Sequence, residues 1–213
     1  MATRLTSVVI QAADPKSLSE FWIEVLGAEV VAGSGGVALQ FVRGPGAKIG
    51  KNRVHLDLES GPGQLERLLR AGAVRADIGQ GEVGWEVLAD PEGNEFCLQP
   101  GLPEGLRWSA ICQDAADPEA QSRFWAVAAG LRVVRQGDWG VAMAERDEAS
   151  RAPRLVMGPP VAEKRGPNRL LLGLSPNQGS VAAVEASRLV AAGARRDGGM
   201  LLDPEDNEFR IGD

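Results

Sequence analysis

The chain contains one histidine, His55, which lies in the segment NRVHLDLE close to two carboxylates. An imidazole can act as a general base or bind a divalent metal, and a nearby carboxylate can orient it for either task. The alternate positions of this segment are Val, Leu and Leu, so strand geometry places His55, Asp57 and Glu59 together on the opposite face. His55 is therefore the first candidate for a base, a metal ligand or the wall of a binding site.

A second polar face is expected in the segment NEFCLQ. Its Phe and Leu alternate with Glu95, Cys97 and Gln99, which then share one side of a strand. A thiol beside an imidazole could serve as a nucleophile, but a half-buried thiol that only packs is the simpler interpretation of Cys97. By the same alternation Cys112 falls on the cup face of the second unit, where packing is again the simpler interpretation.

The chain repeats itself. The segment QAADPKSLSEFWIEVLGAEVV at 11–31 is similar to QDAADPEAQSRFWAVAAGLRVV at 113–134. Asp14 matches Asp117 at an offset of 103. Further on, NRVHLDL is similar to NRLLLGL, and DPEGNEF is similar to DPEDNEF. These blocks indicate a tandem duplication with units at 1–100 and 105–213, joined by the Pro- and Gly-rich stretch QPGLPEGLR.

Each unit reads as two β-α-β-β(-β) modules. In the first unit, LTSVVIQA predicts a strand, DPKSLSEFWIEVLG a helix, and AEVVAG and GVALQFVRG two strands. The order then starts again with strand RVHLDLE, helix GQLERLLRAGA and strands that end in EFCLQP. The predicted fold class is α+β, with Trp22 and Trp125 on the buried faces of their helices. The DPEGN and DPEDN segments are predicted to be turns without a role in chemistry.

This order of elements, with FW and LG after the first strand, KNRVHLDLE midway and DPEGNEF at the end, resembles the vicinal oxygen chelate superfamily. The likeness is to its glyoxalase-like, bleomycin-resistance-like branch, and it extends over nearly the whole chain in two copies. The resemblance implies that two βαβββ modules pair into a cupped mixed sheet, with helices outside and a ligand or metal in the cup.

Metal-dependent members of the superfamily place His or Glu on the first and last strand of each module. The positions that match here are Ser7, a residue near Gln40, His55 and Cys97 in the first unit, and Ala110, Leu171 and Arg210 in the second. Only His55 fits the pattern, so we expect a cup that works without a metal or other cofactor. A Zn, Fe or Mn site of His55, Glu95 and Cys97 is the alternative.

The expected function is binding of a small organic molecule, such as an antibiotic or metabolite, in the cup of the first unit. The alternative is a lyase or isomerase in which His55 is the general base and Asp57 or Glu95 orients it. The residues expected to line the cup are Ser7, Gln11, Gln40, His55, Cys97, Gln99, Trp108 and Arg210. Trp85 and Trp139, near hairpins, would form an aromatic rim.

The composition and charge of the chain limit the classes of partner that we expect it to bind. A net charge of −6 with scattered basic residues argues against a nucleic-acid surface. The loops GPGAKIGKNR and GPPVAEKRGPNR are basic, but each leads into a strand and lacks phosphate-loop spacing, so we expect connections, with Lys48, Lys51 and Arg53 near any anionic ligand. No apolar run reaches the roughly 18 residues that span a bilayer. We expect a cytoplasmic protein, either a monomer with an internal pseudo-dimer or a homodimer.

Overall fold

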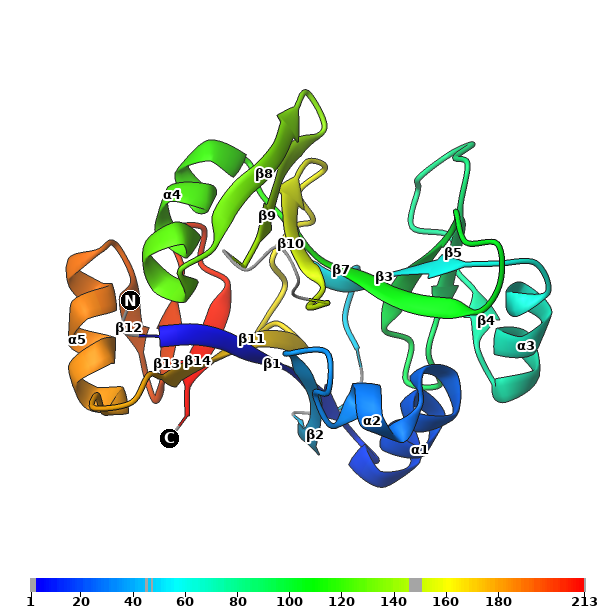
Figure 1. Ribbon diagram of the computed structural model, residues 1–213, viewed down its shortest axis with the longest axis horizontal. Helices are drawn as coiled ribbons and strands as arrows, with labels where there is room; N and C mark the ends of the chain where they lie inside the picture. The colour runs from blue at the N-terminus through cyan, green and yellow to red at the C-terminus, as the bar shows by residue number, and fades with distance from the viewer. Residues whose placement is uncertain (1–2, 45, 47, 146–150, 213) are drawn as a thin grey trace.

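The computed structural model describes residues 3–44, 46, 48–145 and 151–212, and its path is shown in Figure 1. The elements in chain order are β1 (Thr3–Ala12), α1 (Pro15–Leu26), α2 (Ala28–Val31), β2 (Ala38–Arg43), β3 (Val54–Ser60), α3 (Gln64–Ala71), β4 (Val74–Arg75), β5 (Glu86–Ala89), β6 (Glu95–Pro100), β7 (Leu106–Asp114), α4 (Pro118–Ala129), β8 (Arg132–Gly137), β9 (Gly140–Ala144), β10 (Arg154–Gly158), β11 (Leu170–Pro176), α5 (Ala182–Ala191), β12 (Arg195–Asp197), β13 (Met200–Leu202) and β14 (Glu208–Ile211). The predicted α+β fold class and the succession of four modules are confirmed.

The strands form two mixed sheets, and each sheet takes one module from each repeat. The six-stranded sheet has the order β12-β13-β14-β11-β1-β2, and the eight-stranded sheet has the order β4-β5-β6-β3-β7-β10-β9-β8. The second and third modules share the eight-stranded sheet because only residues 101–105 join them, and short connections favour neighbouring strands. The longer loops 44–53 and 159–169 cross to the other sheet. Pairing therefore runs between the repeats, whereas a cup built within the first repeat was expected.

The first module is smaller than predicted. Residues 28–31, expected to be a strand, form the short helix α2, whose chain turns away at Gly33 with a positive φ of 92°. Ala28 and Glu29 are better helix formers than strand formers, which outweighs the two valines that follow them. The first module consequently adds only β1 and β2 to the six-stranded sheet.

Helices α1 and α4 carry the aromatic core that joins the modules. Trp22 of α1 is 1% exposed and packs edge-to-face on Phe96 of β6, with ring centroids 5.3 Å apart. Trp125 of α4 makes the equivalent contact with Phe209 of β14 at 5.4 Å. Each helix thus buries its tryptophan against the last strand of the following module, which confirms the prediction that both tryptophans are core residues.

The DPEGN and DPEDN turns have a structural role beyond the turn itself. The Glu92 carboxylate accepts hydrogen bonds from the backbone N–H of Ala13 and Asp14, at 2.8 and 2.7 Å, and pairs with Arg169 at 2.7 Å. In the second repeat, the Glu205 carboxylate accepts hydrogen bonds from the backbone N–H of Ala116 and Asp117. It also pairs with Arg53 of the first repeat. Each turn therefore ties the start of a helix to an arginine of the other repeat.

A β-bulge changes the face on which Trp108 lies. In the antiparallel pair of β3 and β7, Asp57 is opposite Ala110 but Leu58 is opposite Trp108, so Ser109 is the extra residue. The extra residue reverses the alternation, and Trp108 turns into the hydrophobic core beside Leu58, where it is 5% exposed. The expectation that Trp108 lines the cup is wrong. Within the described residues, no helix is long and apolar enough to span a bilayer.

Candidate functional site

A cavity of about 530 Å³ lies in the concave face of the eight-stranded sheet. Its floor comes from adjacent strands: His55 from β3, Cys97 from β6, Cys112 from β7 and Val156 from β10. Figure 1 shows the β8–β9 hairpin and the loop between β4 and β5 rising above this sheet on the same side. The second and third modules build this cup together, so half of its wall comes from the second repeat.

Two tryptophans form opposite walls of the cavity. Trp85 precedes β5 and Trp139 lies in the β8–β9 hairpin, and each is 42% exposed. The Arg135 guanidinium lies 5.5 Å from the Trp139 ring centroid, a distance at which a cation stabilises the ring orientation. Both tryptophans face the cavity, as expected for its aromatic rim.

The polar part of the floor is a short network centred on Asp57. The Gln99 Nε2 donates a hydrogen bond of 2.6 Å to Asp57 Oδ2, and His55 Nε2 lies 3.4 Å from Asp57 Oδ1. Asp57 Oδ1 is buried, yet it accepts no hydrogen bond from any described residue. His55, Asp57 and Gln99 therefore lie together on the floor, with His55 lining the cavity, and one buried oxygen of Asp57 has no hydrogen bond from the described residues.

Both thiols of the chain line the same floor. Cys97 is opposite Asp57 in the register of β3 and β6, and Cys112 is opposite His55 in the register of β3 and β7. Burial, followed by the negative charge of Asp57, raises the pKa of each thiol above its usual value. The thiols are consequently protonated and weakly nucleophilic at neutral pH, which does not favour a Cys97–His55 nucleophilic pair.

The two cysteines are free. β3 lies between β6 and β7, so their backbones stand about 9 to 10 Å apart, given a strand spacing of about 4.8 Å. A disulfide needs Cα atoms closer than about 7 Å, so the sheet keeps both thiols available to other partners.

Glu95 is engaged elsewhere. Its carboxylate pairs with Lys48 Nζ at 2.5 Å and accepts a hydrogen bond of 3.2 Å from the Asn52 backbone N–H. Glu95 lies two residues before Cys97 on the same strand, beside the loop that leads into β3. Its contacts attach this loop to the sheet. The structure therefore groups Asp57, rather than Glu95, with His55 and Cys97.

The floor matches the chemistry of a metal site, the cofactor type that the family resemblance implies. His55, Asp57 and Cys97 each offer one ligand atom, and these atoms lie within 4.8 Å of one another. A ring nitrogen, a carboxylate oxygen and a thiolate sulfur are all ligands of zinc-like ions. These residues fit a metal ion, and the ion would act there as a Lewis acid toward a bound oxygen.

The remaining predicted ligand-binding residues lie in the other sheet. Ser7 and Gln11 are on β1, Gln40 is on β2 and Arg210 is on β14. The Arg210 guanidinium donates a hydrogen bond to Gln40 Oε1, and Gln11 Nε2 donates one of 3.0 Å to the Asn168 carbonyl. They do not meet His55, because β1 pairs with β11 of the second repeat rather than with β3.

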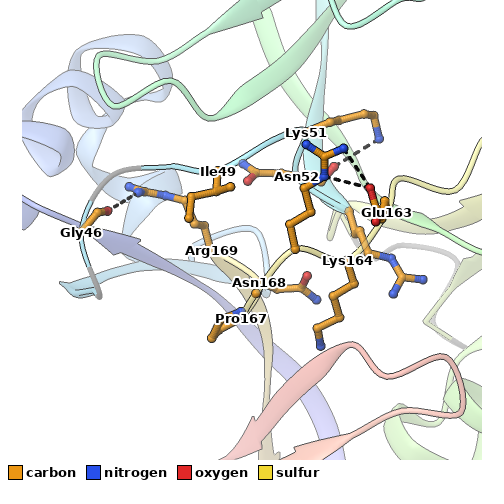
Figure 2. Close-up of a pocket in the computed structure, with 12 residues that line it drawn as sticks. Gly46, Ile49, Lys51, Asn52, Glu163, Lys164, Pro167, Asn168 and Arg169 are labelled. Atoms are coloured by element: carbon orange, nitrogen blue, oxygen red, sulfur yellow. Dashed lines mark hydrogen bonds and ion pairs between the residues drawn. The ribbon is translucent and has the colours of Figure 1, made fainter.

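A second cavity lies between the loops that connect the repeats, and Figure 2 shows its lining. Its volume is about 170 Å³, and each of the five cations among its described lining residues pairs with a carboxylate. The pairs are Lys51 with Asp114, Arg53 with Glu205, Lys164 with Glu208, Arg165 with Glu163 and Arg169 with Glu92. The cavity has no surplus positive charge, so these pairs stabilise the junction of the repeats.

Apart from Trp139, the residues that the third module contributes to the cup were not predicted as parts of the same site as His55. Val156 lies beside Cys112 in the register of β10 and β7, and Lys51 and Asp114 form an ion pair of 2.8 Å at the end of the cup. The alternation of β7 did place Cys112 on a cup face. No local signal shows that this strand joins β3.

The comparisons agree with this architecture. The family described as "Glyoxalase-like domain" matches residues 7–99 and again 110–212. Glyoxalase I from Zea mays is 14% identical, with 98% of this chain and 92% of that chain covered and a TM-score of 0.66. A candidate dioxygenase from Bacillus subtilis is also 14% identical, with coverage of 98% and 84% and a TM-score of 0.64.

Comparison with curated proteins finds no match. At 14% identity the two solved structures establish the shared fold, while the family match accounts for most of the sequence. The chain therefore belongs to the glyoxalase-like domain family and carries that domain twice, within the vicinal oxygen chelate fold.

Proposed function

We propose that the chain binds a small, flat organic molecule in the cup of the eight-stranded sheet. The observation that carries the proposal is the cavity of about 530 Å³ between Trp85 and Trp139. Its size falls within the roughly 300 to 1,000 Å³ of typical small-molecule pockets. Indole walls favour a planar ligand, because stacking adds to the free energy gained by burying apolar surface.

The floor would orient the ligand. Gln99 holds one oxygen of Asp57, which leaves the other oxygen and the His55 ring to bind a polar group of the ligand. A hydrogen-bond donor on the ligand would satisfy the buried Asp57 Oδ1, which the described residues leave unpaired. Binding of this kind requires no metal, and sequestration of an antibiotic or metabolite would follow from affinity alone.

The experiment is a thermal-shift screen against aromatic antibiotics, quinones and aromatic thiol conjugates, followed by calorimetry on each hit. A ligand of the native state raises the Tm by mass action. We expect Trp85→Ala and Trp139→Ala each to weaken a hit at least about tenfold, in line with the loss of one stacking contact. Gln40→Ala, in the other sheet, is the matched control and should leave the affinity unchanged. Hits that bind both tryptophan variants as tightly as the wild type would place the ligand outside this cup.

A second candidate function is general-base catalysis by His55 on a ligand bound in the same cup. The observation that favours it is the distance of 3.4 Å between His55 Nε2 and Asp57 Oδ1, with Gln99 holding the other carboxylate oxygen. Such a dyad can take a proton from a carbon or oxygen acid and hold it on the imidazole.

This candidate is tested by following each hit by NMR for chemical change, including exchange of its protons in D2O. Turnover that His55→Gln abolishes, with ligand affinity retained, would support catalysis. Unchanged ligand in the presence of saturating wild-type protein would rule it out for that compound and leave binding as the function.

A further inference from the structure

We propose that Arg135 and Gly137 are positioning residues that fix Trp139 as the rigid wall of the cup. The inference rests on the proposed ligand binding and deepens it. Within the described residues, neither Arg135 nor Gly137 lines the cavity, whereas Trp139 does. Both would therefore act on a ligand only through the tryptophan ring.

The Trp139 indole packs against one face of β8. Arg135 and Gly137 are alternate residues of that strand, so their side-chain positions share a face. The Arg135 guanidinium lies 5.5 Å from the ring centroid, and a Cβ added to Gly137 would come within 2.8 Å of Trp139 Nε1. A residue without a side chain at 137 therefore leaves room for the ring, and the cation over the ring holds it there.

The backbone of Trp139 is fixed by the neighbouring strand β10. A Cβ added to Gly158 would come within 2.2 Å of the Trp139 carbonyl oxygen. Gly140, the next residue, has a positive φ of 126°, and a Cβ there would come within 2.0 Å of the Met157 carbonyl oxygen. These two glycines let the β8–β9 hairpin pack closely on β10. Both the backbone and the ring of Trp139 are thus held without a ligand.

Trp85, the opposite wall, has a different support. Burial raises the pKa of the Cys97 thiol, and a hydrogen bond with the Trp85 indole lowers it in part. Trp85 is therefore anchored to the floor of the cup through β6. Because the two walls have separate supports, a change in β8 should leave Trp85 in place, and Trp85 serves as an internal control.

A wall that is ordered before binding reduces the entropy that a ligand must lose to order it. A cation over a partly exposed indole contributes enough free energy to change affinity about two- to fivefold. This effect should disappear when the ring is absent, since Arg135 acts through Trp139. A general structural role of Arg135 would persist without the ring.

The first test needs no ligand and uses fluorine NMR of the full chain labelled with 5-fluorotryptophan. The chain has five tryptophans, and Trp→Phe variants assign the signals of Trp85 and Trp139. Arg135→Ala and Gly137→Ala should each move or broaden the Trp139 signal and leave the Trp85 signal unchanged. Arg135→Lys keeps a cation and should change the Trp139 signal least. The control is Arg123→Ala, which removes a cation that is 69% exposed on α4 and should change neither signal.

The second test is a double-mutant cycle on affinity, measured by calorimetry with 2-naphthol, a flat probe with one hydrogen-bond donor. Arg135→Ala should weaken binding about two- to fivefold in the wild-type background. The same substitution should have no effect in the Trp139→Ala background, because the ring through which it acts is gone. Arg135→Lys should retain most of the affinity.

Circular dichroism and the Tm of each variant show whether it is folded, and only folded variants are compared. A Trp139 signal that is unchanged in both Arg135→Ala and Gly137→Ala would overturn the positioning role. An equal loss of affinity with and without the Trp139 ring would also overturn it. A wild type that binds neither 2-naphthol nor any screened compound would overturn the proposed ligand binding, whereas the ligand-free spectra would still decide whether Arg135 and Gly137 fix the ring.

Discussion

Gly173 lies opposite Ser7 in the six-stranded sheet, and a Cβ added to Gly173 would come within 2.1 Å of Ser7 Oγ. Gly173 is the repeat counterpart of Asp57, the centre of the polar network in the other cup. The two cups thus differ for a steric reason, because Ser7 occupies the space that an acid would need. Only the cup of the eight-stranded sheet combines the histidine, the carboxylate and the thiols.

This close approach predicts a compensating pair of substitutions. Gly173→Ala should lower the free energy of unfolding by about 1 to 3 kcal/mol, the usual cost of overpacking. Ser7→Gly should recover most of that loss in the double variant, and urea denaturation measures both. Gly199→Ala is the control, since nothing lies within 4 Å of its Cβ position. Equal losses in the single and double variants would contradict the contact.

The bulge in β7 leads us to expect that Trp108 and Trp85 contribute very differently to the stability of the protein. Trp108→Ala should cost about 3 to 5 kcal/mol, because this side chain is 5% exposed and packs in the core. Trp85→Ala should cost less than about 1 kcal/mol, because its ring is 42% exposed on the cup wall. Chemical denaturation of the two variants is the measurement. Similar losses of unfolding free energy would show that Trp108 lies on the cup wall rather than in the core.

We expect the contribution of the Glu92 carboxylate to the free energy of unfolding to depend on pH. Burial raises its pKa, but hydrogen bonds from Asp14 and Ala13 and the charge of Arg169 outweigh burial, so the pKa lies below its usual value. A lowered pKa stabilises the fold above the unfolded value of about 4.3 and loses this effect as pH falls through the folded value. Glu92→Gln should therefore cost about 1 to 3 kcal/mol at pH 7 and progressively less toward pH 3.

Denaturant titrations at pH 7, 5, 4 and 3 measure this difference for Glu92→Gln. Glu20→Gln is the control, because the side chain of Glu20 is 65% exposed and makes only a loose pair with Lys16. A difference between wild type and Glu92→Gln that stays constant down to pH 3 would show that the charge of Glu92 is not the stabilising feature.

The raised thiol pKa values predict slow alkylation. In chelator-treated protein at pH 8, iodoacetamide should modify Cys97 and Cys112 far more slowly than it modifies the urea-unfolded chain, because the reactive thiolate is scarce. Asp57→Asn should speed the reaction, since it removes a negative charge that raises both pKa values. Mass spectrometry of each cysteine follows the rates, and labelling at the unfolded rate in the folded wild type would show ordinary thiols.

Local patterns in the sequence were sufficient to predict on which face of its strand or helix many of the site residues lie. Strand alternation placed His55 and Asp57 on one face, and Cys97 and Gln99 on another, and in the structure His55 and Cys97 line one cup while Gln99 is hydrogen-bonded to Asp57 beside it. The helical spacing of apolar residues placed Trp22 in the core. These features depend on the period of a strand or helix, which a single segment contains.

The tertiary structure alone decided which strands meet. The register of β3 with β7 brings Cys112 to His55, and the pairing of β1 with β11 takes Ser7 and Gln40 to the other sheet. The bulge at Ser109 turned Trp108 into the core, against the simple alternation. Partner choice, register and bulges arise from contacts between segments that are distant in sequence, so residue types and spacing show which face a side chain occupies but not which faces come together.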